Sequence, residues 1–273
     1  MDIRSILVNV DLDSANSTVL RYAVHLAEQM DAELIGVAAD DPSLALIGLD
    51  GGVAAADFYP MERSGIEKRL AAAEAQFHSL VPTGMKTQWR AYLAPEVQSV
   101  IDTARIADLI VTGATKSPTF QEQRRVDLAQ LILGAGRPVL DVAQNATAFA
   151  CEKIVIGWKD TREARREAAD AMPFLQRAKH VLAVTVGEGD RAAERRSLDD
   201  LLVWLAGHGV TASGDLIENK EGLDDVLEST SRTYQADLVV SGAYGHSRMR
   251  EWLFGGMTRN LLEANTLNRL FSN

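Results

Sequence analysis

The feature that most constrains the fold of this chain is an internal repeat. The segment ADLIVTGA at 107–114 recurs as ADLVVSGA at 236–243, and each copy has the apolar, β-branched character of a buried strand that ends at a glycine. Other strand and helix segments match in the same order. Self-similarity over half the chain predicts two copies of one α/β domain, residues 1–146 and 150–273, with a junction at 144–151 (QNATAFAC).

Within each copy, short apolar strands alternate with segments of helical periodicity. In the first copy we expect strands at 6–10, 33–39, 86–91, 107–113 and 137–142, and helices at 20–30, 61–80, 97–106 and 128–133. In the second copy we expect strands at 153–157, 181–186 and 238–241, and helices at 162–178 and 224–234. This alternation predicts an α/β fold of two tandem, open, parallel-sheet domains of Rossmann-like type, with helices on both faces of each sheet.

Two segments carry more detailed expectations. The face of the 61–80 helix that we expect to be buried consists of Ile66, Leu70, Ala73 and Phe77. The segment 40–60 contains several glycines and two prolines, so we expect it to be irregular, either as a surface loop or as a mobile lid.

Composition excludes several classes of function. The chain has 273 residues, a formal net charge of −10 and a single cysteine, Cys151. An acidic protein lacks the basic surface that general binding to nucleic acid or an anionic membrane requires. One cysteine allows no intramolecular disulfide, and we expect Cys151 to be a small apolar residue, not a reactive thiol. No apolar stretch is long enough to span a bilayer and no signal peptide is evident, so we expect a cytoplasmic protein.

A set of glycines follows the 238–241 strand. Gly242 and Gly245 come first, and Gly255, Gly256 and Thr258 follow nine residues later, just before a segment of helical periodicity. Because glycine has no Cβ, backbone N–H groups can curl closely around an anion, and a helix N-terminus adds free N–H groups and a partial positive charge. The pattern indicates a phosphate site, while the alternative is that these glycines only form tight turns.

The same segment, GAYGHSRMREWLFGGMTRNLL, resembles the nucleotide-binding signature of the universal stress proteins, and both repeats resemble the domain of that family. The resemblance implies an open five-stranded parallel sheet that binds ATP or a related adenine nucleotide, with or without Mg²⁺, at the carboxyl ends of its strands. The candidate nucleotide-binding residues are Gly242, Ala243, Gly245, Gly255, Gly256, Met257, Thr258, Val186 and Lys159. Among these, Val186 matches the residue of the family whose backbone touches the base.

The two copies are not equivalent at this motif. In the first copy Gly113 is present, but Lys116 stands where the second copy has Gly245, and the downstream glycine pair is missing. Asp11 does match the acidic residue with which the family holds the base and ribose. We therefore expect the first copy to have a degenerate site and a structural or dimer-forming role.

The second copy departs from the family pattern after its first strand. Lys159 stands where the family has Asp or Asn, so it would not accept hydrogen bonds from adenine or ribose, although it could contact a phosphate. We expect Asp160 or Thr161 to cap the next helix. Two readings of Trp158 stay open: it packs near a base, or it finishes the strand in the core.

The C-terminal tail, TLNRLFSN, is a further departure. In the family the last strand is apolar and pairs across a dimer. Asn268 and Arg269 are polar, so we expect them to weaken this strand and to alter the sheet edge. The family precedent also favours an intramolecular pair of domains that imitates the dimer, with a further homodimer of chains left open.

Catalytic signatures are missing from the sequence. It contains no P-loop and no G-x-S-x-G elbow, and its histidines lack metal-ligand spacing. The resemblance to universal stress proteins implies a stress-response protein that binds an adenine nucleotide in its second domain, and the missing signatures imply at most a slow ATPase. The alternative is a nucleotide-independent interaction scaffold.

Overall fold

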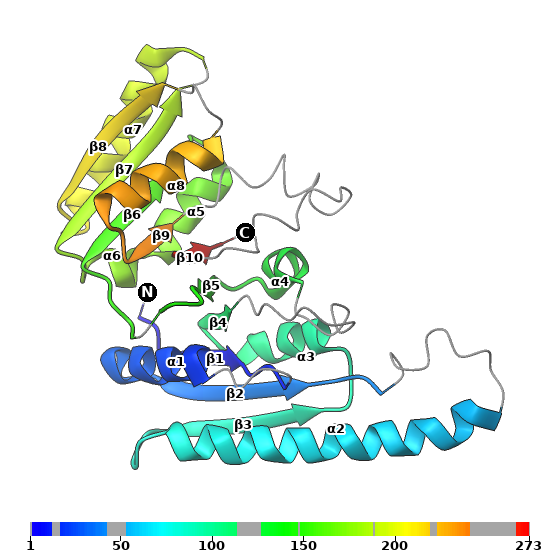
Figure 1. Cartoon of the computed structure of the whole chain (residues 1–273). Helices are drawn as coiled ribbons and strands as arrows, with labels where there is room; N and C mark the ends of the chain where they lie inside the picture. The colour runs from blue at the N-terminus through cyan, green and yellow to red at the C-terminus, as the bar shows by residue number, and fades with distance from the viewer. Residues whose placement is uncertain are drawn as a thin grey trace. The chain divides into compact units, whose positions relative to one another are not determined.

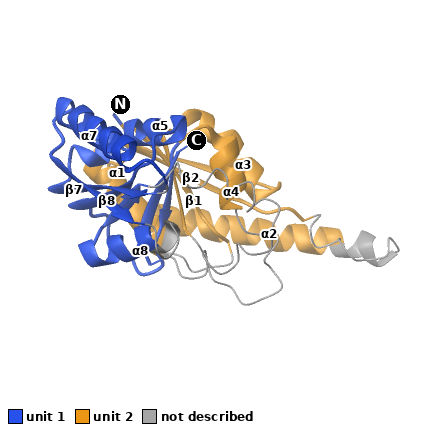
Figure 2. Ribbon diagram, turned by 90° about the horizontal axis from the view of Figure 1, so that it is seen from above, with its two compact units in different colours: residues 1–2, 138–273 blue, residues 3–137 orange. Residues whose placement is uncertain are grey.

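The fold was established from a computed structural model of the whole chain. The structure describes residues 2–12, 17–42, 53–113, 127–146, 148–187, 189–218, 223–240 and 266–272. It divides into two compact units, the N-terminal unit (residues 3–137) and the C-terminal unit (residues 138–273 with 1–2), which Figure 2 shows in orange and blue.

The N-terminal unit is a parallel sheet with helices on its faces. Its strands are β1 (Ser5–Asn9), β2 (Glu33–Ala39), β3 (Thr87–Tyr92) and β4 (Leu109–Gly113). Its helices are α1 (Ser17–Met30), α2 (Val53–Leu80), α3 (Glu96–Thr103) with a 3-10 turn at Ala104–Ile106, and α4 (Leu128–Ala135). The strand order β3-β2-β1-β4 places β1 between β2 and β4, and the strand pairs described in this unit are all parallel (Figure 1).

The C-terminal unit repeats this arrangement and extends it. Its strands are β5 (Val139–Val142), β6 (Lys153–Gly157), β7 (His180–Gly187), β8 (Ala212–Glu218), β9 (Leu238–Val240) and β10 (Asn268–Phe271). Its helices are α5 (Arg162–Asp170), α6 (Met172–Leu175), α7 (Arg191–Gly207) and α8 (Leu223–Tyr234). The strand order is β5-β10-β9-β6-β7-β8, in which β5 runs antiparallel to β10 and the other pairs are parallel. The predicted α/β class of tandem parallel-sheet repeats is confirmed.

The central strands form the core because both of their faces are covered. Ile6, Leu7 and Val8 of β1 have no exposed surface, as expected for apolar strands in the middle of a parallel sheet. The predicted buried face of α2 is confirmed, since Ile66 and Phe77 are fully buried and Leu70 and Ala73 are nearly so.

The structure corrects four predicted elements. Helix α2 begins at Val53, so the helix takes the last part of the 40–60 segment, while residues 43–52 lie outside the described residues. An alanine-rich run at 54–56 favours helix there. The helix predicted at 162–178 is broken after Asp170, because Pro173 at the start of α6 has no N–H to continue the α5 ladder.

The other two corrections concern α7 with β8, and the tail. The sequence patterns predict no element at 191–218, yet α7 and β8 form there and pack together (Figure 1). The tail forms β10, so the expectation that Asn268 and Arg269 weaken this strand was wrong. The Asn268 side chain strengthens the sheet: its Oδ1 accepts from the Ala143 N–H at 2.9 Å and its Nδ2 donates to the Asp237 carbonyl at 2.9 Å.

Across the part of the chain that the structure describes, no helix is both long and apolar enough to cross a membrane.

Candidate functional site

The strand order places a topological switch point in the C-terminal unit. From β6 the chain moves outward through β7 to β8, and then returns to β9 on the other side of β6. Val240, at the end of β9, pairs with Ile156 of β6. Open α/β sheets bind ligands at the carboxyl ends of the strands on either side of such a point. The candidate site is therefore the carboxyl edge of β9, β6 and β7.

The whole glycine motif lies outside the described residues. Gly242, Ala243, Gly245, Gly255, Gly256, Met257 and Thr258 all belong to this undescribed segment, which spans 241–265. The structure places the residue that precedes this segment. The segment starts directly after Val240, beside the end of β6. The described part of β9 therefore ends at the switch point, and the glycines follow it in the sequence.

Val186 lies near the carboxyl end of β7, where this strand extends beyond β6. Gly157, the last residue of β6, pairs with Val184, so Val186 is two residues further along β7. The Val186 side chain is only 4% exposed and packs with Val226 and Leu227 of α8. Its side chain therefore belongs to the core, which leaves its backbone as the part available at the edge.

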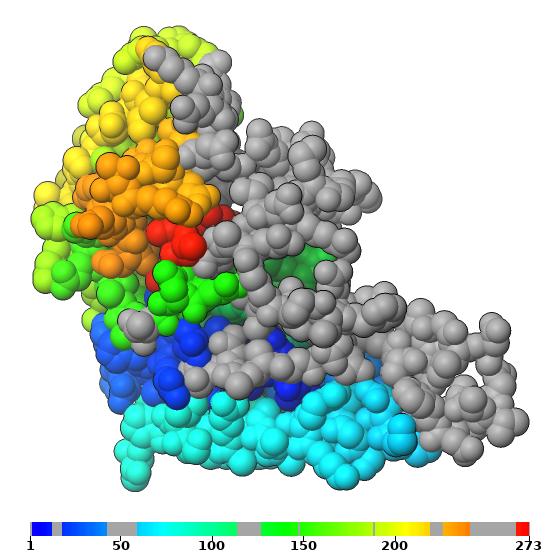
Figure 3. Space-filling view, in the orientation of Figure 1, coloured from blue at the N-terminus to red at the C-terminus, as the bar shows by residue number. Residues whose placement is uncertain are grey.

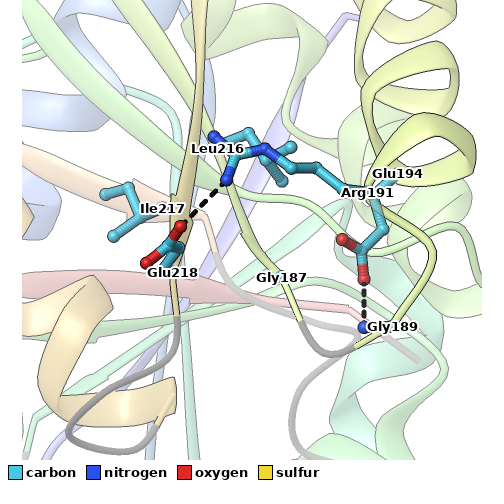
Figure 4. Close-up of a pocket in the computed structure, with 7 residues that line it drawn as sticks. All are labelled: Gly187, Gly189, Arg191, Glu194, Leu216, Ile217 and Glu218. Carbon is cyan, nitrogen blue, oxygen red and sulfur yellow. Dashed lines mark hydrogen bonds and ion pairs between the residues drawn. The ribbon is translucent and has the colours of Figure 1, made fainter.

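A pocket of about 610 Å³ opens next to Val186 (Figure 4). Its wall consists of the end of β7, the start of α7 and the end of β8, and its lining residues are Gly187, Gly189, Arg191, Glu194, Leu216, Ile217 and Glu218. Arg191 forms an ion pair of 3.0 Å with Glu218. The Glu194 Oε1 accepts from the Gly189 N–H at 3.0 Å. The pocket therefore combines an apolar wall from β8 with a rim of mixed charge.

At Gly187, where β7 enters this pocket, an added side chain would press against Glu194. A Cβ added at Gly187 would lie 3.2 Å from the Glu194 Oε2, which is tighter than an ordinary van der Waals contact. The first turn of α7 is already capped, because the Asp190 Oδ1 accepts from the N–H groups of Ala192 at 2.9 Å and Ala193 at 3.2 Å. The missing side chain of Gly187 thus leaves space in the pocket, and the first N–H groups of α7 are bonded to Asp190.

Lys159 and Trp158 follow β6 directly. The Lys159 side chain is exposed, and its carbonyl accepts from the Thr161 N–H at 2.6 Å. Thr161 caps α5, with its Oγ1 accepting from the Ala164 N–H at 3.2 Å, as one of the two predicted capping residues. Trp158 is 6% exposed and its indole N–H donates to the Ser197 Oγ at 3.0 Å, which favours the core position over a position next to a base.

The corresponding edge of the N-terminal unit is filled by polar side chains. The Val10 N–H donates to the Val37 carbonyl at 2.8 Å, as the Trp158 N–H does to Val184 at 2.7 Å, so the two edges can be compared residue by residue. Asp40 then stands at the place of Gly187. It is 5% exposed, and the Arg69 Nη2 donates to its Oδ2 at 2.7 Å.

Asn9 stands at the place of Gly157 in the same comparison. Its Nδ2 donates to the Glu96 Oε1 at 2.9 Å. The first repeat therefore carries bonded polar side chains where the second repeat carries two glycines.

Solved structures with the same architecture match the chain over its full length. A universal stress protein from Archaeoglobus fulgidus DSM 4304 has a TM-score of 0.70 at 12% identity, and the match covers 98% of this chain and 96% of that one. The chain has the universal stress protein fold. A protein from Pseudomonas aeruginosa UCBPP-PA14 assigned to the universal stress proteins has a TM-score of 0.60 at 19% identity, with 99% and 93% covered.

A third structure, a functionally unknown protein from Pseudomonas aeruginosa PAO1, has a TM-score of 0.59 at 18% identity, with 99% of this chain and 92% of that chain covered. No protein-family model matches the chain, and no curated protein matches it either. The universal stress protein fold is thus shown by architecture, at 12% to 19% sequence identity to these solved structures.

Sequence reasoning missed the pocket in this fold because it missed α7 and β8. Arg191, Glu194 and Glu218 all come from those two elements. A usable signal was present in Asp190, a helix-capping residue that directly precedes the α7 segment. Within the described residues, no group of His, Cys, Asp or Glu is arranged to hold a metal ion.

Proposed function

We propose that the C-terminal unit binds an adenine nucleotide, such as ATP, at the carboxyl edge of β9, β6 and β7. One observation carries the proposal: the glycine motif begins two residues after Val240, which pairs with Ile156 at the switch point. Glycines of the kind that hold phosphate thus follow, in the sequence, a strand that ends at the edge where α/β sheets hold ligands.

Each part of the nucleotide has a proposed partner. The backbone N–H groups of Gly242, Gly245, Gly255 and Gly256, with the Thr258 hydroxyl, hold the phosphates and ribose. The backbone at Val186 borders the base, and the neighbouring pocket of about 610 Å³ gives the base room at Gly187. Lys159, exposed after β6, supplies a cation for the phosphates.

The filled edge of the N-terminal unit supports a stoichiometry of one nucleotide per chain. The corresponding positions of the N-terminal unit carry the side chains of Asn9 and Asp40, which are bonded to Glu96 and Arg69, where the second repeat has glycines. The proposed function is binding and regulation: occupancy orders the glycine segment and so changes the surface offered to a partner in a stress response.

The first experiment is mass spectrometry of small molecules released from the purified, denatured protein, together with calorimetric titration by ATP. We expect close to one adenine nucleotide per chain. Two nucleotides per chain would overturn the proposal that the N-terminal unit binds none. No released nucleotide and no heat of binding would overturn the proposal and favour the interaction scaffold.

A substitution localises the site. Gly245→Val should abolish nucleotide binding, because a branched side chain prevents the backbone from wrapping a phosphate. The matched control is Gly65→Val on α2 in the other unit, where an added Cβ meets nothing within 4 Å. Equal loss of binding in both variants would count against a site at the glycine motif.

A further inference from the structure

The last strands of the two sequence repeats pair with each other. β5 ends the first repeat and β10 ends the second, and both lie in the C-terminal unit. They run antiparallel, with Arg269 opposite Asp141, Leu270 opposite Leu140 and Phe271 opposite Val139. We infer that the charges of Asp141 and Arg269 select this pairing within one chain over self-pairing of either strand between two chains.

Asp141 makes it unfavourable for β5 to pair with a strand that offers no positive charge. It is 2% exposed, and a buried carboxylate is stable only when cations or hydrogen-bond donors compensate its charge. Directly opposed residues of an antiparallel pair have side chains on the same face, with Cβ atoms about 5 Å apart. The register therefore brings the Arg269 side chain onto the face that carries Asp141.

Glu228 of helix α8 also holds the Arg269 side chain. The Arg269 Nη2 lies 3.6 Å from the Glu228 Oε2, and the arginine side chain is 23% exposed. Figure 3 shows the orange surface of α8 directly against the red surface of β10. An arginine fixed between two carboxylate-bearing elements presents a localised positive charge to whichever strand pairs with β10.

Self-pairing would place like charges together. If β5 paired with a second β5 in the register centred on Leu140, the two Asp141 carboxylates would occupy diagonal positions on one face, about 7–8 Å between their Cα atoms. A pair of β10 strands centred on Leu270 would do the same with two Arg269 side chains. Only the mixed pair puts opposite charges on that face, as natural sheets do to exclude wrong edges.

Asn268 reinforces the mixed pair through hydrogen bonds. Its amide bridges the Ala143 N–H beyond β5 and the Asp237 carbonyl before β9. The two polar residues that interrupt the apolar tail therefore both act on the choice of partner strand.

A double-mutant cycle tests the charge coupling. Asp141→Asn and Arg269→Gln should each raise the unfolding equilibrium constant, on the order of tenfold or more, because each removes one of the two opposite charges that the strand register brings onto one face. In the double variant the increase in the unfolding equilibrium constant should be about tenfold smaller than the product of the two single increases, because neighbouring residues that interact are not additive. A double variant that equals the product would overturn the inference.

Arg232→Gln is the matched control for this cycle. Arg232 also pairs with Glu228, at 2.6 Å, but lies on α8 and not on a strand. It should show no coupling to Asp141→Asn. If Arg232 coupled as strongly as Arg269, the effect would come through Glu228, and the strand-pairing inference would fail.

Crosslinking tests the choice of partner directly. In a Cys151→Ser background, Val139→Cys and Phe271→Cys stand opposite each other, so oxidation should yield a crosslinked monomer on a non-reducing gel. Adding Asp141→Asn and Arg269→Gln should raise the share of crosslinked dimer. An unchanged share of dimer would show that the charges do not select the partner.

Discussion

The Asp237 carboxylate accepts a hydrogen bond of 2.9 Å from the backbone N–H of Lys153. The same Oδ2 accepts from the Glu152 N–H at 2.9 Å, so one carboxylate before β9 holds the start of β6. Asp108 does the same in the first repeat, where its Oδ2 accepts from the N–H groups of Arg4 at 3.0 Å and Ser5 at 3.1 Å. The repeated aspartate thus joins the two strands that flank each switch point.

Asp237→Ala should destabilise the protein by about 2 kcal/mol, because two hydrogen bonds to a charged acceptor are lost at a half-buried position. Asp237→Asn should cost less, since an amide oxygen still accepts. Urea unfolding would measure both. The control is Asp199→Ala, which removes only an exposed helical ion pair with Arg195 and should change stability by less than about 0.5 kcal/mol. Equal losses in the two alanine variants would refute the role of Asp237.

Two glycines of the N-terminal unit should respond in opposite directions to alanine. A Cβ at Gly36 would come within 2.6 Å of the Trp89 Cε3 and 2.8 Å of the Phe77 ring, so Gly36→Ala should cost about 1–3 kcal/mol by overpacking. Gly65 lies inside α2 with nothing within 4 Å, so Gly65→Ala should stabilise by about 0.5–1 kcal/mol. Thermal unfolding of the pair checks the sign, and a stabilising Gly36→Ala would contradict the packing described for Trp89.

The Cys151 thiol should be slow to react. Burial raises the pKa of this thiol, so less thiolate is present near neutral pH than in a free cysteine. Alkylation by iodoacetamide at pH 8 should therefore be much slower in the native protein than in urea. Because the pKa is raised on folding, its contribution to stability is full below the unfolded value, about 8.5, and is lost as the pH rises above it. Equal alkylation rates in native and unfolded protein would contradict this.

The elements that could be predicted from sequence are those whose burial is uniform. β2 and β6 begin and end at the predicted residues, since both are apolar runs covered on two faces. α7 and β8 could not be predicted, because their patterns are blurred. Val203 is 72% and Trp204 36% exposed on α7, and β8 is nowhere fully buried.

The candidate site shows a similar division. The residues next to strands, Val186 and Lys159, could be placed at the carboxyl edge from the repeat alone. The pocket beside them could not, because its rim includes the Arg191–Glu218 ion pair, which joins the start of α7 to the end of β8, and neither element was predicted. At the corresponding edge of the N-terminal unit, Arg69 of α2 donates to Asp40. No local sequence pattern encodes this contact between residues that are distant in sequence.

Lys159 should contribute to binding of nucleotide phosphates but not of the nucleoside. Lys159→Ala is expected to weaken ATP binding by roughly fivefold to tenfold, as loss of one exposed cation near a polyanion implies, and to leave adenosine binding unchanged. The effect should shrink as salt is raised from 50 to about 500 mM, because salt screens exposed charges. Lys153→Ala is the matched control, since Lys153 lies at the opposite, amino end of the same strand, with its Nζ 3.4 Å from the Gln235 Oε1. Calorimetry with both ligands would distinguish the cases: an equal loss for ATP and adenosine would mean that Lys159 shapes the site and does not contact phosphate.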